Sequence, residues 1–161
     1  MSKKTIPWRI QETQFTCGPS AFRNCLLVFG IHASEKRLRE LMDTTKDGTD
    51  ENGICQATEE FNLNYKMHCT SSKDVFGRQL LKALKSGHPC ILEVEDTAHW
   101  VAVVSYKKRK ITVVDTMLLT ENNSKPTEFT LKEIKNWAHS FNKFEGGKAW
   151  FLFIELWPKD E

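Results

Sequence analysis

The sequence lacks any apolar run long enough to span a membrane, and this absence argues against an integral membrane protein. Its first residues, Met1 to Lys4, are followed by polar sequence and not by the apolar core of a signal peptide. From the sequence we therefore expect a cytoplasmic protein without a membrane span.

The number and spacing of the cysteines also argue against some classes of site. The chain has 5 cysteines, an odd number, and no two of them form a Cys-x-x-Cys pair. This pattern does not favour a disulfide framework or a four-ligand zinc site. We expect a reduced compartment, no metal and no other cofactor, with most thiols acting as small buried hydrophobic groups.

Neither sign of charge is in excess. The 23 basic and 21 acidic side chains leave a formal net charge of +2, which argues against a protein that binds nucleic acid by neutralising many phosphates. The basic run from Lys107 to Lys110 lies between two apolar segments. We interpret it as a solvated hairpin tip and not as a phosphate or membrane patch.

The length of 161 residues fits one domain, which we expect to cover residues 1–161 and to hold its own core. Helical spacing and capping residues predict helices at about 17–29, 34–42, 53–61, 72–87 and 130–137. Alternation and β-branched residues predict strands at 63–70, 89–94, 99–106, 110–116 and 149–157, the last following a turn at Gly146-Gly147. Helices precede an antiparallel sheet, which is an α+β arrangement.

Cys17 is the first candidate catalytic residue along the chain. It directly precedes Gly18 and Pro19, and proline is favoured in the first turn of a helix. A thiol at a helix N-terminus has a lowered pKa, and the thiolate is the nucleophile. The alternative is an ordinary buried cysteine.

His99 begins a predicted strand and can reach a neighbouring helix end, although a lone histidine is more often an ordinary edge residue. A three-residue loop in the following hairpin would place Tyr106 opposite Lys110. Asp115 would then oppose Val101 and share a face with His99. A two-residue loop would place His99 and Asp115 on opposite faces. A site that uses both residues therefore predicts a loop with an odd number of residues, or a bulge. Asp96, three residues before His99, is the weaker carboxylate candidate.

A cysteine nucleophile also needs hydrogen-bond donors for the oxyanion that develops on the substrate. One is the backbone N–H of Cys17 itself. A nearby glutamine amide can supply the second, and both Gln11 and Gln14 precede the cysteine. Either could equally be a solvated loop residue.

Together these residues resemble the C39 family of double-glycine, bacteriocin-processing peptidases and their stand-alone relatives. The matching pattern is Gln11, then Cys17-Gly18-Pro19-Ser20-Ala21 with Asn24 and Leu27, Leu84-x-x-Gly87-x-Pro89, His99-Trp100-Val101 and Ile111-x-Val113-x-Asp115. The resemblance implies a papain-like cysteine proteinase fold. It also implies Cys17 as nucleophile, His99 as base, Asp115 as orienting carboxylate and Gln11 as oxyanion donor.

The resemblance has departures. Thr16 stands where family members often have aspartate, and Thr116 follows the carboxylate where proline is usual. We expect a cysteine peptidase that hydrolyses a peptide or protein substrate, with cleavage after Gly-Gly or another small-residue site as one option. An isopeptidase or acyltransferase using the same residues, and a catalytically silent module that binds peptides, are the alternatives.

Overall fold

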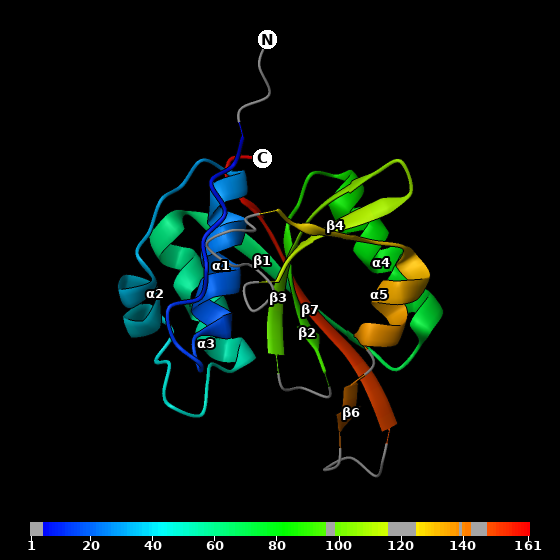
Figure 1. The fold of residues 1–161 in the computed structure, drawn as a ribbon, viewed down its shortest axis with the longest axis horizontal. Coiled ribbons are helices and arrows are strands. Elements are labelled where there is room, and N and C mark those ends of the chain that lie inside the picture. The colour runs from blue at the N-terminus through cyan, green and yellow to red at the C-terminus, as the bar shows by residue number, and fades with distance from the viewer. Residues whose placement is uncertain (1–4, 96–98, 116–124, 139, 143–147) are drawn as a thin grey trace.

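The structure is a computed structural model that describes residues 5–95, 99–115, 125–138, 140–142 and 148–161 (Figure 1). Within these residues the chain forms the elements α1 (Cys17–Val28), α2 (Glu35–Leu41), α3 (Glu51–Ala57), the 3₁₀ helix η1 (Thr58–Phe61), β1 (Leu63–Thr70), α4 (Lys73–Lys85), β2 (Cys90–Val94), β3 (His99–Lys107), β4 (Lys110–Val114), β5 (Thr127–Phe129), α5 (Leu131–Trp137), β6 (Ser140–Asn142) and β7 (Lys148–Pro158). This order confirms the predicted α+β class.

One antiparallel sheet forms the centre of the molecule. Its strands follow the order β1-β7-β2-β3-β4-β5, and β6 pairs with β7 outside this path. The strand β7 is long, and it pairs with β1 along the whole of β1 and with β2 on its other side. The predicted strand at residues 63–70 therefore becomes a sheet edge, far in sequence from its partner.

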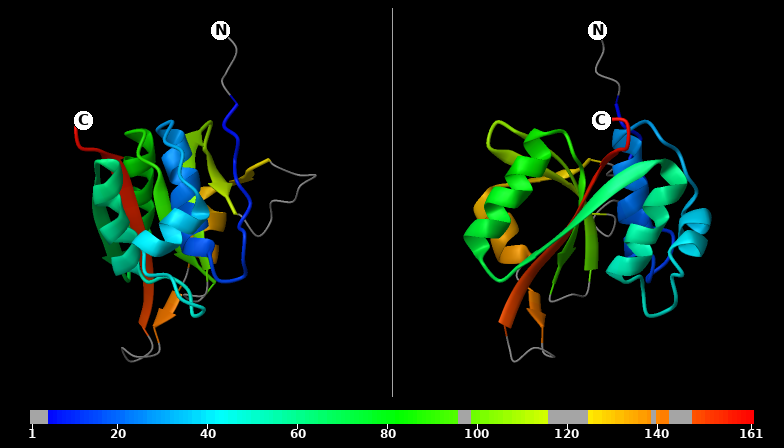
Figure 2. Two further views of the ribbon diagram at one scale, coloured as in Figure 1. Left: turned by 90° about the vertical axis from the view of Figure 1, so that its left-hand side faces the viewer. Right: turned by 180° about the vertical axis from the view of Figure 1, so that it is seen from behind.

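Helices cover both faces of the sheet. In Figures 1 and 2, α1, α2 and α3 lie on one side, and α4 and α5 lie on the other. Each side has its own core. Phe22, Leu26 and Ile91 belong to the cluster under α1, while Phe76 and Phe153 belong to the cluster under α4. The alternation of side chains along β2 and β3 supplies both clusters, because successive residues point to opposite faces.

Side-chain caps explain where most of the helices begin. The side chains of Ser34, Asp50, Ser72 and Thr130 each accept a hydrogen bond from the backbone N–H three residues later. The Thr130 cap is the capping box that the sequence predicts. Asp50 was not predicted as a cap, and it starts the third helix two residues earlier than the apolar spacing indicates.

The hairpin between β3 and β4 differs from the prediction at its turn. Lys107 pairs with Lys110, so the loop has two residues and not three. Both loop residues, Lys108 and Arg109, have positive φ, at 51° and 64°, which is the conformation of the tight hairpin turns whose twist matches the strands. The predicted pairing of Tyr106 with Lys110 is therefore wrong.

A bulge in β3 restores the register that the predicted site requires. The pairing shifts between Val103 and Ser105, and beyond it Ala102 pairs with Val114. One extra residue in one strand reverses the facing of every side chain that follows. Asp115 is consequently level with Val101, on the same face as His99, as the sequence analysis required.

Two short strands, β5 and β6, were not predicted. Each has three residues, too few for a strand pattern to stand out in sequence. The predicted turn at Gly146-Gly147 and the alternative carboxylate Asp96 lie outside the described residues.

Candidate active site

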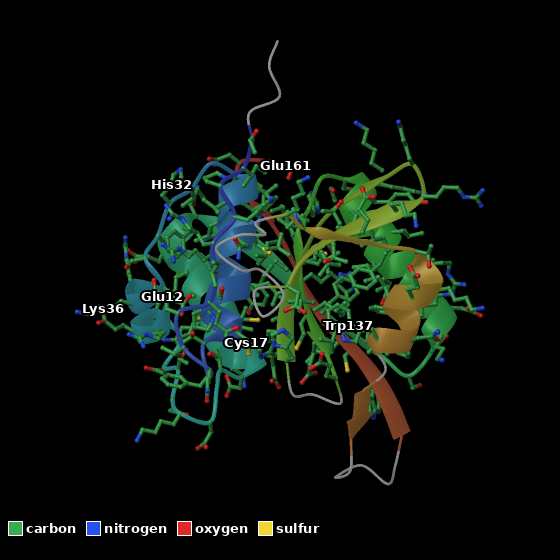
Figure 3. All side chains as sticks on the ribbon, in the orientation of Figure 1. Glu12, Cys17, His32, Lys36, Trp137 and Glu161 are labelled. Atoms are coloured by element: carbon green, nitrogen blue, oxygen red, sulfur yellow. The ribbon has the colours of Figure 1, made fainter. Side chains whose placement is uncertain are left out.

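Cys17 is the first residue of α1, and Thr16 precedes it as the N-cap residue. The helix is held against the sheet by side chains that are completely buried, among them Phe22 and Leu26. Cys17 itself is only half-buried, and its side chain is labelled in Figure 3. A helix start has backbone N–H groups without partners inside the helix, and these stabilise an anion.

His99 and Asp115 form a buried pair. The Nε2 atom of His99 lies 2.8 Å from Oδ1 of Asp115, and the two side chains are 6% and 4% exposed. The carboxylate can only accept a hydrogen bond, so Nε2 carries the proton and donates it. The ring's other nitrogen, Nδ1, is the one left to face the thiol of Cys17.

The side chain of His99 and the backbone of Trp100 and Gly18 stabilise the thiolate form of Cys17. Burial on its own raises the pKa of this thiol, but hydrogen bonding to these groups and the charge of His99 outweigh that effect, so the pKa of Cys17 is lowered from its ordinary value. Burial raises the pKa of the Cys25 and Cys55 thiols, and nearby acidic side chains raise that of Cys55 further.

The pKa of the His99 imidazole is shifted in the opposite direction, upward. Burial lowers its pKa, but hydrogen bonds and charges from Asp115 and Cys17 raise it more, to about 9. A thiol with a lowered pKa beside a histidine with a raised pKa favours a thiolate–imidazolium pair at neutral pH. The arrangement can therefore present a reactive sulfur anion with a proton donor next to it.

Gln11 lies in the segment that leads into α1. Its side-chain Nε2 donates to the carbonyl of Thr13 at 2.5 Å, which orients the amide nitrogen within this segment. An amide nitrogen carries two N–H groups, and the bond to Thr13 uses one of them. The other predicted candidate, Gln14, is exposed.

Two histidines outside the Cys17–His99 pair share a carboxylate. His68 and His88 each lie 2.7 Å from an oxygen of Glu155, one on each side of the carboxylate, and His88 also contacts Glu161 at 3.1 Å. The pairing depends on β7 lying beside β1 and on the C-terminus folding back. No local sequence pattern signals this arrangement.

An open groove of about 540 Å³ lies near the start of α1 and the start of β3. Its walls come from the segment between α2 and α3, from α3 itself, from Glu93 of β2 and from Trp100 of β3. Neither Cys17 nor His99 lines the groove, but neighbours of both residues contact or form its walls. Trp100 follows His99 directly and donates from its indole nitrogen to the Thr49 carbonyl at 2.9 Å. Thr49 packs so closely on Gly18 that an added Cβ would lie 2.8 Å from it.

The groove is acidic. No lysine, arginine or histidine is among its lining residues, which include the five acidic residues Asp43, Asp47, Asp50, Glu51 and Glu93. Burial, and then the charge of Glu51, raise the pKa of Glu93 to about 7. The negative charge of the groove therefore increases as the pH rises through neutrality. No local sequence pattern indicates this groove, because its acidic residues come from separate segments.

The described residues contain no group of three or more histidine, cysteine or acidic side chains placed to hold a metal ion. All five cysteines fall within the described ranges, and none is in a disulfide. Across the same ranges, no helix is both long enough and apolar enough to cross a membrane.

The chain belongs to the Peptidase C39 family, whose sequence model it matches over residues 5–142. An uncharacterized protein of Methanothermobacter marburgensis is 32% identical over 108 residues, which cover 65% of this chain and 68% of that protein. A second uncharacterized protein, from Methanothermobacter thermautotrophicus, is 27% identical over 112 residues, 68% of this chain and 70% of that one.

Solved structures show the same fold. The peptidase domain of Streptococcus ComA, a bifunctional ABC transporter, superposes with a TM-score of 0.66 at 19% identity, covering 96% of this chain and 99% of that domain. A double-glycine motif protease from an AMS/PCAT transporter, solved with its leader peptide, has a TM-score of 0.65 at 15% identity, covering 94% and 91%. A stand-alone C39-like protein from Bacillus anthracis has a TM-score of 0.58 at 11% identity, covering 92% and 94%. The predicted papain-like fold is thereby confirmed.

Proposed function

We propose that this protein is a cysteine peptidase that hydrolyses peptide bonds through a thioester intermediate. The observation that carries the proposal is that His99, which pairs with Asp115 at 2.8 Å, also stabilises the thiolate of Cys17. A thiol, a base and a third group that orients the base are the arrangement that nucleophilic cysteine catalysis uses. Membership of a peptidase family supports the same reaction class.

In the first half of the reaction, the Cys17 thiolate attacks the carbonyl carbon of the scissile bond. The backbone N–H of Cys17 and the amide of Gln11 donate to the oxyanion that forms. When the tetrahedral intermediate collapses, the C–N bond breaks and His99 gives its Nδ1 proton to the leaving amine. The acyl group then remains on sulfur as a thioester, and Asp115 still accepts from Nε2.

In the second half, neutral His99 removes a proton from a water molecule, which attacks the thioester carbonyl. The same two donors hold the second oxyanion. Collapse breaks the C–S bond, releases the carboxylic acid and regenerates the thiolate beside imidazolium. Asp115 keeps the imidazole in the correct tautomer and stabilises its charged form in both halves.

A cleavage-site profile on a mixed peptide library tests the proposal and its substrate. We expect new peptide termini, identified by mass spectrometry, that wild-type protein generates and the Cys17→Ala variant does not. Including a primary amine in the reaction separates hydrolysis from acyl transfer, because transfer products carry the amine's mass. Cleavage after Gly-Gly would match the double-glycine relative, and equal product formation by both proteins would overturn the proposal.

The pH dependence of kcat/KM follows from the two shifted groups. The active form needs thiolate on Cys17 and a proton on His99, so activity rises as pH passes the lowered pKa of the thiol and falls near pH 9. We expect a bell-shaped profile, measured with one peptide over pH 4 to about 10.5. A profile that keeps rising through pH 9 to about 10, as for an ordinary free thiol, would contradict the ion pair.

The acidic groove predicts a preference for substrate charge. Of two otherwise identical peptides, we expect the one with lysine near the scissile bond to be cleaved about threefold to tenfold faster at low salt than the one with glutamate, because the groove attracts cations. The ratio should grow as the pH rises through 7, since Glu93 then becomes charged.

Glu93→Gln should reduce this preference, whereas Glu128→Gln, an exposed glutamate on β5, should leave it unchanged. The measurement is kcat/KM for both peptides at several salt concentrations. A ratio near unity that does not respond to salt or to Glu93→Gln would show that the groove does not take part in substrate selection.

A further inference from the structure

Glu35 is a completely buried carboxylate that the proposed mechanism does not use. It is the first residue of α2 and is 0% exposed, although glutamate is seldom buried without a specific partner. Both of its oxygens accept from the backbone N–H of Glu12, at 3.1 and 3.3 Å. Its partner lies 23 residues away, in the segment between Gln11 and Cys17.

The same carboxylate also reaches the residue that precedes the nucleophile. The hydroxyl of Thr16, which is 0% exposed, helps to stabilise the charged form of Glu35, accepts from the backbone N–H of Thr13 at 3.1 Å and lies 3.2 Å from the Thr13 carbonyl oxygen. Thr13 in turn offers the carbonyl to which the Gln11 amide donates. A continuous set of hydrogen bonds thus joins Glu35 to the side chain proposed as the oxyanion donor.

A second anchor holds the segment on the other side of Gln11. The buried side chain of Asn24, on α1, accepts from the backbone N–H of Arg9 at 2.9 Å and donates to the carbonyl of Arg9 at 3.0 Å. Gln11 therefore lies between two fixed points of the segment: Arg9, which is bonded to Asn24 of α1, and Glu12, which is bonded to Glu35 of α2. An extended segment without helix or strand bonds of its own owes its position to such anchors.

We infer that Glu35 is a positioning residue, which places the Gln11 amide for the oxyanion by holding the backbone at Glu12 and the hydroxyl of Thr16. This inference rests on the proposed peptidase function. Burial raises the pKa of Glu35, an effect that its bonds to Thr16 and Glu12 partly offset.

The test compares Glu35→Ala and Glu35→Gln with Glu40→Gln, an exposed glutamate on the same helix. We expect kcat to fall about tenfold to a hundredfold in Glu35→Ala with little change in KM, since displaced oxyanion donors affect the transition state. Glu35→Gln keeps an acceptor oxygen and should lose less, and Glu40→Gln should match wild type. Alkylation of Cys17 by iodoacetamide should remain fast in all three, because alkylation forms no oxyanion.

A double-mutant cycle tests whether Glu35 affects activity through Gln11. If Glu35 acts through the Gln11 amide, then Glu35→Ala should cost little further activity once Gln11→Ala is present. Full additivity of the two losses, or an equal fall in the alkylation rate of Cys17, would overturn the inference by indicating a general structural role.

Hydrogen exchange keeps this inference separable from the peptidase proposal. In the wild-type protein the Glu12 amide should be protected, and Glu35→Ala should remove that protection while leaving the amides of β2 unchanged. Unchanged protection of Glu12 would overturn the inference whatever the activity. Loss of protection in a protein whose wild type cleaves no peptide would support the anchoring and refute the peptidase function alone.

Discussion

Cys17→Ala is expected to lower kcat/KM for any cleaved peptide by at least about a thousandfold, because the covalent intermediate can no longer form. The sulfur is the atom that attacks in the proposed mechanism, and its pKa is lowered, whereas burial raises the pKa of the thiols of Cys25, Cys55 and Cys90. The measurement is single-turnover cleavage, which does not depend on product release.

The matched control is Cys69→Ala, because Cys69 is an exposed thiol on β1. It should retain wild-type activity, and the unfolding midpoints of both variants should stay close to that of wild type. Turnover by Cys17→Ala within tenfold of wild type would exclude nucleophilic catalysis by this residue. The protein would then be either a different kind of hydrolase or a peptide-binding module.

Asp115→Asn is expected to lower kcat by about 10²- to 10⁴-fold, the range for loss of an oriented general acid–base. Asparagine preserves the shape and one acceptor oxygen at 2.8 Å from His99, but it removes the negative charge that helps to raise the pKa of the imidazole. The alkaline limb of the pH profile should therefore move below pH 9.

The control for this variant is Asp160→Asn, at the exposed C-terminal end. Activity and pH profile should both be unchanged in that protein. An Asp115→Asn enzyme with full kcat and an alkaline limb still near pH 9 would show that the carboxylate neither orients nor charges His99, and would leave Asp115 with a structural role only.

Much of the fold was predicted from local sequence signals. The capping residues Ser34 and Thr130, and Gly87 after α4, whose φ is 81°, act within one helical turn, so their residue types predict where helices begin and end. The turn between β3 and β4 was predicted one residue too long. A two-residue turn with Lys108 and Arg109 in the left-handed region has no glycine or asparagine to signal it.

The loop length in the hairpin was predicted wrongly, but His99 and Asp115 still share a face, as predicted. His99 and Asp115 share a face only if the pairing of the two strands is shifted by one residue from the register that a regular hairpin with a two-residue loop would have. Either a three-residue loop or a bulge supplies this shift. The structure has the bulge, after Val103. Sequence alone could not choose between them, because a bulge is fixed by the packing of both strands and not by one residue type.

Long-range polar contacts could not be predicted. The bonds from Glu35 to Glu12 and from Glu155 to His68 and His88 join segments 23 to 87 residues apart. Their formation depends on which helix covers the N-terminal segment and on which strand lies beside β7. A charged residue that becomes buried looks in sequence like any solvated one.

The proposed mechanism depends on a thiolate–imidazolium pair between Cys17 and His99. Site-resolved alkylation with iodoacetamide at pH 7, followed by mass spectrometry of the peptides, measures this directly. We predict that Cys17 reacts at least about tenfold faster than the exposed Cys69, and that His99→Ala removes the difference. Equal rates at Cys17 and Cys69 in the native protein, unaffected by His99→Ala, would contradict the pair and the mechanism built on it.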